Sequence, residues 1–294
     1  MERIRRIRLG SRGLRLAERI ADLEAGRVGP AAPRDAATVM VLRAPAGQRA
    51  EAGQGAEVLM LRRTAAMKFA PGAYVFPGGS VDPADYSEEA GWQGPSPGEF
   101  GAAFGTSPER ARALVCAAVR ETFEESGVLL AGPPGSGPPA VPAGSSWEAD
   151  RLALTAGQLT LAGLLTQRGL VVRADLLVPW ARWITPTAEP RRFDARFFAA
   201  VLPPGQEAAR HEAEADHVAW LNPASAIESA RAGEISMLPP TAVTLQEFAA
   251  AAAAGHGPAD IVGQWREFEA VTPRMVLEDG VVWLLVPDEI EYPL

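Results

Sequence analysis

Hydrophobic and polar positions follow one another along this chain in patterns that predict both strands and helices. Short apolar runs bounded by glycine, proline and polar residues predict β-strands over residues 38–43, 57–62, 73–76, 176–184, 195–202 and 217–221. Two later apolar runs, 275–277 and 281–286, flank Asp279-Gly280, a dipeptide that favours a tight hairpin turn. We therefore expect a β-sheet, followed by a hairpin towards the C-terminal end.

The clearest predicted helix begins after Ser107. Serine is a favoured N-cap residue, Pro108 suits the first turn, and Glu109 suits the positive end of the helix dipole. Gly127 suits the left-handed position that ends a helix. Between these ends an apolar stripe recurs at helical spacing, namely Ala111, Leu114, Val115, Ala118, Val119 and Phe123. Further helices are expected at residues 147–168, after Asn222-Pro223, and at 241–254.

Three segments lack a pattern that would build a core. The N-terminal residues mix arginines with apolar side chains, as a membrane-surface or partner helix does, but Gly10 and Gly13 interrupt them and acidic residues dilute their charge. We expect residues 1–34 to form a plain N-terminal extension. Residues 80–106 read as an inserted loop and residues 131–146 as a mobile linker, because both are rich in glycine and proline.

Composition and charge narrow the function. The 294 residues are 47% hydrophobic, with a formal net charge of −8 and a pI of about 5.1. A protein with this net charge does not bind nucleic acid through its surface as a whole. We therefore expect a small-molecule nucleotide as partner, held by local positive charge or by metal. A homodimer is possible. The single cysteine, Cys116, excludes an intrachain disulfide and reads as packing. Without an apolar run of membrane-spanning length or a secretory signal, we expect no membrane partner and a cytoplasmic location.

Three carboxylates are crowded near the end of the predicted helix. Glu121, Glu124 and Glu125 stand at i, i+3 and i+4, so their side chains lie over neighbouring turns of one face. Like charges at this spacing cost an isolated helix about 0.2–0.5 kcal/mol per pair. A hard divalent cation such as Mg²⁺ prefers carboxylate, water and phosphate oxygens. The cluster therefore predicts a metal site, against the alternative of a solvated acidic face.

Residues 120–128 resemble half of a known signature. They match the Nudix hydrolase pattern G-x5-E-x7-R-E-U-x-E-E-x-G-U, where U is apolar, except that Thr122 stands at the first U, and Gly79 resembles the opening glycine. Arg120 follows Gly79 by 41 positions (120 − 79) instead of 14, so about 27 extra residues lie inside the pattern. The glutamate expected eight positions before Arg120 is Arg112. At that position the chain therefore lacks the acidic side chain that would support the metal site.

An insertion at this point resembles the branch of Nudix enzymes similar to the peroxisomal coenzyme A diphosphatases. Residues 61–79, 183–194 and 234–240 are similar to the same branch. The resemblance implies an α/β fold, a Nudix-type α/β/α sandwich over residues 35–294 with a mixed sheet, an inserted loop before the signature helix and extra C-terminal helices. Tyr292-Pro293-Leu294 does not resemble the peroxisomal Ser-Lys-Leu address, so the compartment is not carried over.

The same resemblance implies a chemistry. It implies Mg²⁺- or Mn²⁺-dependent cleavage of coenzyme A or acyl-coenzyme A to 3′-phosphoadenosine 5′-phosphate and (acyl-)phosphopantetheine. Glu121, Glu124, Glu125 and the Gly79 carbonyl are the implied metal ligands, and Glu121 also counts as catalytic. Arg120 is the implied ion-pair partner of these glutamates, because its forked donors match a carboxylate.

Two further groups complete the predicted site. In many family members an acidic residue before the last sheet strand acts as a base or a metal ligand. Glu214, six residues before Trp220, is the first candidate for this role and Glu212 the second. Both glutamates are equally well explained as solvated surface acids. Five basic residues are expected to bind the substrate, although surface charge explains them equally well: Arg62, Arg63, Lys68, Arg191 and Arg192. The three histidines have no metal-ligand spacing and receive no role.

Two alternatives stay open at this point. One is a Nudix hydrolase of another nucleoside diphosphate derivative, such as ADP-ribose or NADH, with the same carboxylates and a different pocket. The other is a non-catalytic regulatory module, which the missing acid at Arg112 and the arginine-rich N-terminus favour.

Overall fold

The computed structural model describes residues 4–9, 11–45, 55–64, 72–135, 137–208, 215–263 and 265–287. Within these ranges the central sheet consists of nine strands: β2 (Arg34–Arg43), β3 (Glu57–Arg63), β4 (Ala73–Val75), β5 (Gly78–Ser80), β9 (Val178–Ile184), β10 (Phe193–Val201), β11 (Ala215–Leu221), β12 (Ser236–Met237) and β13 (Ala270–Val271). Their order is β12-β4-β3-β2-β10-β9-β13, with β11 also pairing with β3 and β5 with β2. Because β10 is parallel to β2 and antiparallel to β9, the sheet is mixed.

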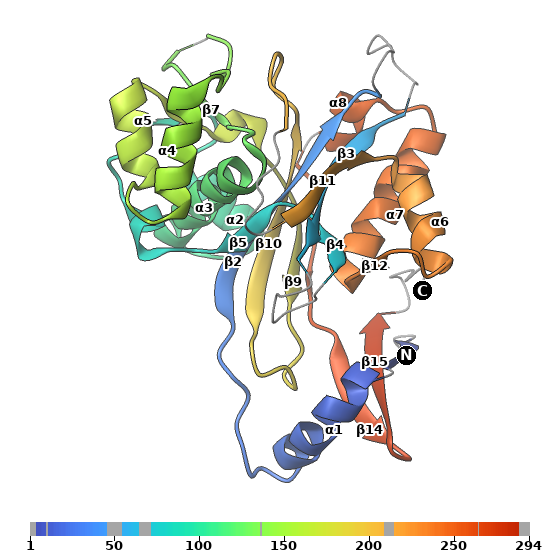
Figure 1. The fold of residues 1–294 in the computed structure, drawn as a ribbon. Coiled ribbons are helices and arrows are strands. Elements are labelled where there is room, and N and C mark those ends of the chain that lie inside the picture. Colours follow the sequence, from blue (N-terminus) through green and yellow to red (C-terminus); the bar gives the residue numbers. More distant parts are fainter. Residues whose placement is uncertain are drawn as a thin grey trace.

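Helices cover both faces of this sheet (Figure 1). On one face lie α2 (Pro97–Phe104) and α3 (Pro108–Ser126), with α4 (Ser145–Thr155) and α5 (Leu161–Arg168) packed outside α3. The other carries α6 (Pro223–Arg231), α7 (Pro239–Ala253) and α8 (Pro258–Val262). Side chains along β3 point alternately to the two faces of the sheet, so the strand contributes to both hydrophobic cores. Leu59 packs in the core with α3, whereas Val58 and Met60 pack in the core with α7. The predicted α/β/α sandwich is confirmed.

The carboxylate helix, α3, forms where the local signals predict it. The Ser107 hydroxyl accepts a hydrogen bond of 3.3 Å from the backbone N–H of Arg110. Gly127 ends the helix with a φ of 74°, in the left-handed region that glycine adopts without strain. Leu114 and Val119 of the predicted stripe are fully buried. The carboxylates therefore lie on the last turns of a helix whose two ends are fixed by its own sequence.

A partly buried ion network ties the first turns of α3 to the sheet. Arg110 donates to both carboxylate oxygens of Asp35 on β2, at 2.6 and 2.5 Å. Arg196 on β10 is fully buried and donates to Asp35 at 2.6 Å. Arg182 on β9 donates to both oxygens of Asp194 at 2.9 and 2.8 Å. The network fixes α3 against β2 and β10, and with it the position of the carboxylates.

Residues 80–106 are not the loop that their glycine and proline content predicted. They contain η1 (Pro83–Tyr86), β6 (Trp92–Gln93) and α2. Ser96 and Glu99 form a capping box at the start of α2, with the Ser96 N–H donating to the Glu99 carboxylate at 2.7 Å. Phe100 is fully buried and its ring centroid lies 6.1 Å from that of Phe198. The insertion therefore contributes to the core.

Two predictions between residues 131 and 168 are also wrong. The helix expected over 147–168 is divided into α4 and α5, because the chain turns at Gly157 (φ 67°) and restarts at Thr160, whose hydroxyl accepts from the Gly163 N–H at 3.1 Å. Within 131–146, β7 (Ala131–Gly132) pairs with β8 (Val171–Arg173), which η2 (Ala174–Leu176) follows. Gln206 donates to the Ala140 carbonyl at 2.7 Å, so this segment is held by the domain rather than forming a linker.

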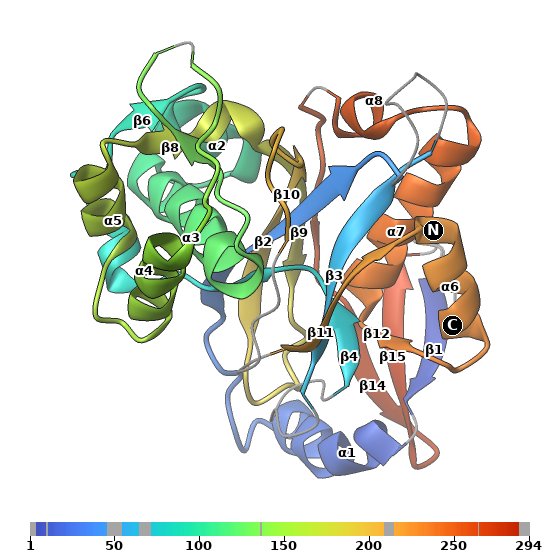
Figure 2. The ribbon, with the colours of Figure 1, turned by 45° about the horizontal axis from the view of Figure 1, so that its top comes forward.

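The N-terminal residues are not a plain extension. A three-stranded antiparallel sheet joins the two ends of the described chain, in the order β1 (Ile4–Leu9), β15 (Val281–Pro287) and β14 (Arg274–Glu278). Helix α1 (Ser11–Glu24) packs on it through Leu16 and Ile20. Asp279 and Gly280 have positive φ at the turn between β14 and β15, as the predicted hairpin requires. Figures 1 and 2 show both ends in this small unit.

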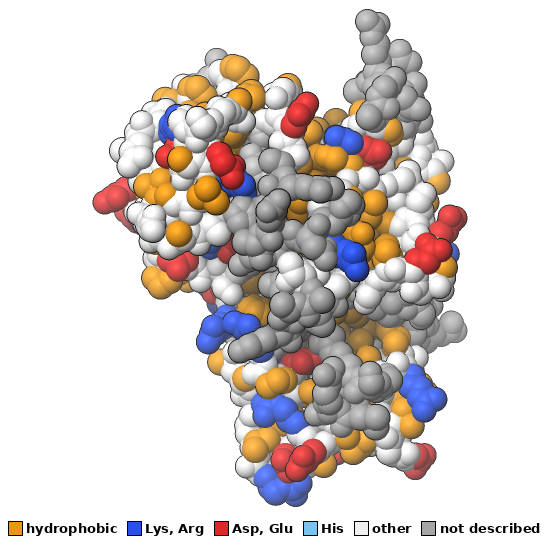
Figure 3. Space-filling view, viewed as in Figure 1, with side chains coloured by type: hydrophobic (Ala, Val, Ile, Leu, Met, Phe, Trp, Pro, Cys, Tyr) orange, Lys and Arg blue, Asp and Glu red, His pale blue; other side chains and the backbone are white. Residues whose placement is uncertain are grey.

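The surface carries no dominant charge on the face shown in Figure 3. Basic and acidic side chains lie scattered there among hydrophobic and polar ones. In the ranges given above, no helix is long and apolar enough to cross a membrane.

Candidate active site

The last turns of α3 lie directly against β5. The Gly78 N–H donates to the Glu125 carboxylate at 2.8 Å, and Gly79 pairs with Ala37 in the centre of the sheet. A Cβ atom at Gly79 would stand 2.5 Å from the Cδ of Glu121, closer than real side chains pack. Glycine at this position therefore lets the Glu121 carboxylate reach the backbone of β5.

Arg120 organises this cluster. Its Nη1 donates to Glu121 at 2.9 Å and to Glu124 at 3.2 Å. Its Nη2 donates to the carbonyl of Ser80 on β5 at 2.9 Å. The guanidinium thus connects two carboxylates of α3 with the strand opposite, and the ion pair implied by the resemblance is present.

Asp85 is the residue that reasoning from the sequence missed. Its side chain is 1% exposed and receives Nε and Nη2 of Arg120 at 3.0 and 2.9 Å. Asp85 stands six positions after Gly79, the spacing at which the Nudix signature places its first glutamate. Arg112, where we expected that acid, instead donates to the Ser87 carbonyl at 3.1 Å. The extra residues therefore lie between Asp85 and Arg120, and counting from the glycine would have found the acid.

The electrostatics of the cluster follow from its burial. Burial raises the pKa of the Glu121 carboxyl to about 7; the Arg120 charge opposes this rise and the Glu124 charge adds to it. Burial disfavours the charged form of Arg120, but the Asp85 bonds and the Glu121 charge outweigh this and raise its pKa. Arg120 is therefore always a cation, whereas Glu121 titrates near neutral pH when no metal ion is present.

The donors at this site fit a hard divalent cation. Three carboxylates share one helix face, and the Gly79 carbonyl belongs to the strand that Glu121 approaches. As the side chains stand, no three acidic, histidine or cysteine side chains within the described ranges converge tightly enough to hold an ion. The reason is that Arg120 holds Glu121 and Glu124 while the Gly78 N–H holds Glu125. Glu121, Glu124 and Glu125 would have to turn from these donors towards a bound ion.

Comparison with known proteins decides the family. A family model described as the NUDT19 Nudix domain matches residues 33–248. The chain belongs to the Nudix hydrolases. Acyl-coenzyme A diphosphatase NUDT19 from Homo sapiens is 31% identical over 314 residues, which cover 90% of this chain and 82% of that protein. The protein of the same name from Gallus gallus is 31% identical over 252 residues, covering 70% of this chain and 65% of the chicken protein, just under two thirds of its length.

A solved structure supports the same assignment. The crystal structure of a Nudix hydrolase from Alicyclobacillus acidocaldarius superposes with a TM-score of 0.62 at 29% sequence identity, over 80% of this chain and 97% of that chain. The family and the coenzyme A diphosphatase branch expected from the sequence are therefore confirmed, and the chain is a Nudix enzyme.

Several predicted site residues of this Nudix hydrolase lie outside the described ranges. These are Glu214, its runner-up Glu212, and Lys68. The residue after Glu214 is the first of β11 and pairs with Arg63 at the end of β3. The role of Glu214 or Glu212 as base or ligand, and that of Lys68 in substrate binding, therefore stay predictions.

The remaining basic residues fall into two pairs. Arg62 and Arg63 end β3, and Arg62 lies opposite Tyr74 of β4. Arg192, directly before β10, is buried and donates to the carbonyls of Thr185 and Ala31 at 2.9 and 2.8 Å. Its neighbour Arg191 lies over the ring of Phe193. Substrate binding by either pair stays a prediction, and Arg192 would first have to leave its carbonyl partners.

Two further buried residues lie in or against α3. Arg151 on α4 is 3% exposed and donates to the carbonyl of Glu124 at 2.7 Å, which satisfies one of the unpaired carbonyls at the helix end. Cys116 lies in the core, and burial raises the pKa of its thiol to about 12. Arg151 thus supports the carboxylate turn, and Cys116 is packing, as the sequence predicted.

Proposed function

We propose that this Nudix hydrolase cleaves the pyrophosphate linkage of coenzyme A or acyl-coenzyme A with Mg²⁺ or Mn²⁺. The products would be 3′-phosphoadenosine 5′-phosphate and (acyl-)phosphopantetheine. The observation that carries the proposal is the contact of the Glu121 face of α3 with Gly78-Gly79, joined by the Arg120–Asp85 pair. The substrate class is supported by relatives that are named acyl-coenzyme A diphosphatases.

Each residue of the cluster has a defined task in this account. Glu121, Glu124, Glu125 and the Gly79 carbonyl would hold the cations, which supply charge neutralisation of the pyrophosphate and an activated water. Water oxygen adds to one phosphorus, the bridging P–O bond breaks, and the departing phosphate keeps the bridging oxygen with its electron pair. Before a cation binds, Arg120 holds Glu121 and Glu124 on the face of α3 that meets β5, and Asp85 keeps Arg120 in place. Glu214 stays our candidate for the base that takes the proton of the water.

The non-catalytic alternative loses its main support. It rested on the missing acid at Arg112 and on the arginine-rich N-terminus, and Asp85 provides an acid that binds Arg120 at the spacing of the signature. Hydrolysis of another nucleoside diphosphate derivative, such as ADP-ribose or NADH, remains the competing proposal, because the same carboxylates would serve it.

A substrate panel tests the proposal. Purified protein is incubated with coenzyme A, an acyl-coenzyme A, ADP-ribose, NADH and a capped RNA in Mg²⁺, and the products are identified by mass spectrometry. We expect coenzyme A and its thioester to turn over fastest. Turnover of ADP-ribose or NADH with coenzyme A left intact would show that the substrate is wrong while the reaction class is right.

A further inference from the structure

The small sheet formed by the two ends of the chain has an edge strand, β14, with a symmetric arrangement of charged and apolar residues. Its five residues are Arg274, Met275, Val276, Leu277 and Glu278. An arginine begins the strand, a glutamate ends it, and three apolar residues lie between them. β14 is the last strand in the order β1-β15-β14, and within the described ranges only β15 pairs with it. Its outer edge can therefore pair with a further strand.

The hairpin geometry determines which backbone groups face this outer edge. The turn Asp279-Gly280 has two residues with positive φ, and the residues that flank it are paired with each other. In a two-residue hairpin the flanking residues exchange backbone hydrogen bonds, and the direction of the backbone groups alternates along the strand. Counting back from Glu278, the even-numbered residues direct their N–H and C=O groups towards β15. Met275 and Leu277 direct theirs to the outer edge.

The side chains of β14 divide between two faces of the small sheet. Met275 and Leu277 lie on the face that α1 covers, where they are half-buried beside its core. Arg274 and Glu278 are exposed on the opposite face, where Glu278 also pairs with Arg6 of β1. The edge strand is therefore apolar on one face and carries opposite charges at the two ends of the other face.

We propose that β14 pairs antiparallel with β14 of a second copy of this chain, about a two-fold axis at Val276. This register sets Met275 opposite the partner's Leu277, so the outward N–H and C=O groups of both strands meet. It also sets Arg274 opposite the partner's Glu278, twice because of the symmetry, with Cβ atoms about 4.5–5.5 Å apart. The result is a six-stranded antiparallel sheet in the order β1-β15-β14-β14-β15-β1.

The second copy also enlarges a core that is small in one chain. The buried residues of this core are Leu16, Ile20, Ala188 and Val282. α1 lies close to β15, where a Cβ atom at Gly13 would meet Val282 at 3.0 Å. In the six-stranded sheet the two β15 strands are three strand spacings apart, roughly 14 Å, and packed helices need about 8–10 Å. Both α1 helices therefore fit side by side, with Met275 and Leu277 of each copy between them.

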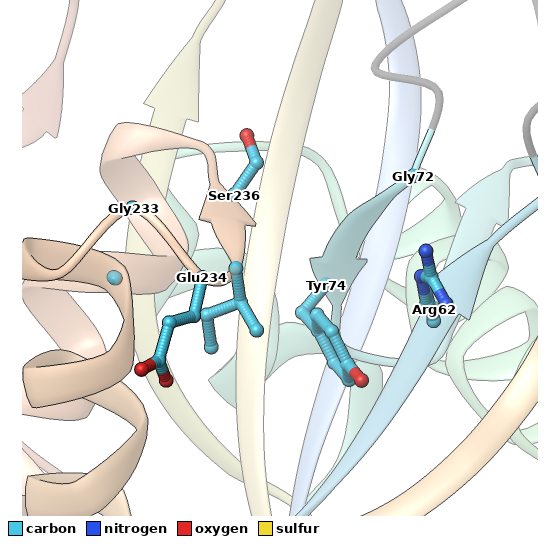
Figure 4. Close-up of a pocket in the computed structure, with 8 residues that line it drawn as sticks. Arg62, Gly72, Tyr74, Gly233, Glu234 and Ser236 are labelled. Atoms are coloured by element: carbon cyan, nitrogen blue, oxygen red, sulfur yellow. The ribbon is translucent and has the colours of Figure 1, made fainter.

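Other edge strands do not match a second copy in this way. β1 has Arg5, Arg6 and Arg8 among its six residues, and basic residues on an edge strand oppose edge-to-edge pairing. β12 and β13, at the two ends of the central sheet order, have two residues each. Beside β12 the surface is hollowed by a pocket of about 530 Å³, whose lining includes Tyr74 and Glu234 (Figure 4). β14 combines sufficient length with self-complementary charges.

Sedimentation equilibrium of the full chain tests the pairing. The wild type should reach a mass near twice the 31.1 kDa of one chain at concentrations up to about 100 μM. Arg274→Glu and Glu278→Arg each set like charges opposite one another in both pairs, so each should weaken self-association at least about tenfold. Arg8→Glu, exposed on the same face of β1, makes the same change of charge as Arg274→Glu and should associate like the wild type. A monomeric wild type, or wild-type association in both β14 variants, overturns the proposal.

Mixing the two β14 variants tests the register. In a heterodimer of Arg274→Glu with Glu278→Arg each pair again joins opposite charges, so the equimolar mixture should associate about as tightly as the wild type. The double variant Arg274→Glu/Glu278→Arg should self-associate for the same reason, and circular dichroism checks that every variant is folded. A mixture that stays monomeric overturns the register. Neither measurement uses turnover, so this inference and the proposed function can fail separately.

Discussion

Asp85 and Arg120 form a two-bond ion pair, with Nε and Nη2 of the guanidinium 3.0 and 2.9 Å from the two carboxylate oxygens. Because Arg120 also holds Glu121 and Glu124, Asp85 determines where the carboxylate face of α3 is anchored. The 35 positions between the two residues (120 − 85) hide this relationship in the sequence.

Replacing Asp85 should damage both stability and catalysis. Asp85→Asn removes the most buried of the three carboxylates that pair with Arg120, so we expect a loss of about 3 kcal/mol in the free energy of unfolding. Displacement of the glutamates should lower kcat by roughly 100-fold. Urea denaturation and steady-state kinetics check both values. Asp85→Glu, which restores the residue of the signature, should keep more activity than Asp85→Asn; equal kcat values for wild type and Asp85→Asn would remove Asp85 from the site.

Glu121→Gln should abolish most turnover while the fold remains. Loss of a metal ligand and of the carboxylate nearest Gly79 should lower kcat by at least about 100-fold and weaken Mn²⁺ binding. Electron paramagnetic resonance of free Mn²⁺ measures that binding. Glu109→Gln, on the first turn of the same helix, is the matched control and should bind Mn²⁺ like the wild type. Wild-type Mn²⁺ affinity in Glu121→Gln would show that the ion is held elsewhere.

Glycine at position 79 should be indispensable for the Glu121 contact. The Cβ of Gly79→Ala would meet the Glu121 carboxylate at 2.5 Å, so either the carboxylate or β5 must move. We expect roughly a 100-fold loss in kcat. Gly29→Ala, where a Cβ meets nothing within 4 Å, should leave kcat unchanged. Full activity in Gly79→Ala would mean that Glu121 works from a different position.

The metal-free protein should lose stability as the pH rises. The Glu121 carboxyl has a pKa of about 7 in the folded protein because of burial, against about 4.5 when unfolded. Its contribution is therefore fully present below pH 4.5 and is lost as the pH rises through 7, by on the order of 3 kcal/mol. Urea denaturation in EDTA at pH 5 and pH 8 measures this change. Glu121→Gln should be more stable relative to wild type at pH 8 than at pH 5, and an equal difference at both values would contradict the account.

The sequence predicts best what neighbouring residues determine. The ends of α3 follow from Ser107 and Gly127, and the hairpin follows from Asp279-Gly280, because each signal acts within a few residues. The glutamate face follows for the same reason, since helical spacing alone places Glu121 and Glu125 together.

What the sequence did not predict depends on distant partners. β1 pairs with β15, so Ile4 meets Pro287, and no local pattern indicates this pairing. Asp85 escaped notice because the insertion lies between it and Arg120. The buried role of Phe100 depends on Phe198 of β10, although the capping box before it was readable. Tertiary contacts, rather than propensity, decide each of these features.

The most direct test of the central claim is product analysis of coenzyme A hydrolysis in Mg²⁺ by the wild type, with Glu121→Gln and EDTA as controls. Mass spectrometry should find equal amounts of 3′-phosphoadenosine 5′-phosphate and phosphopantetheine with the wild type. Both products should fall at least about 100-fold in Glu121→Gln and vanish in EDTA. Undiminished formation of these products by Glu121→Gln, or their absence with the wild type, would contradict the account.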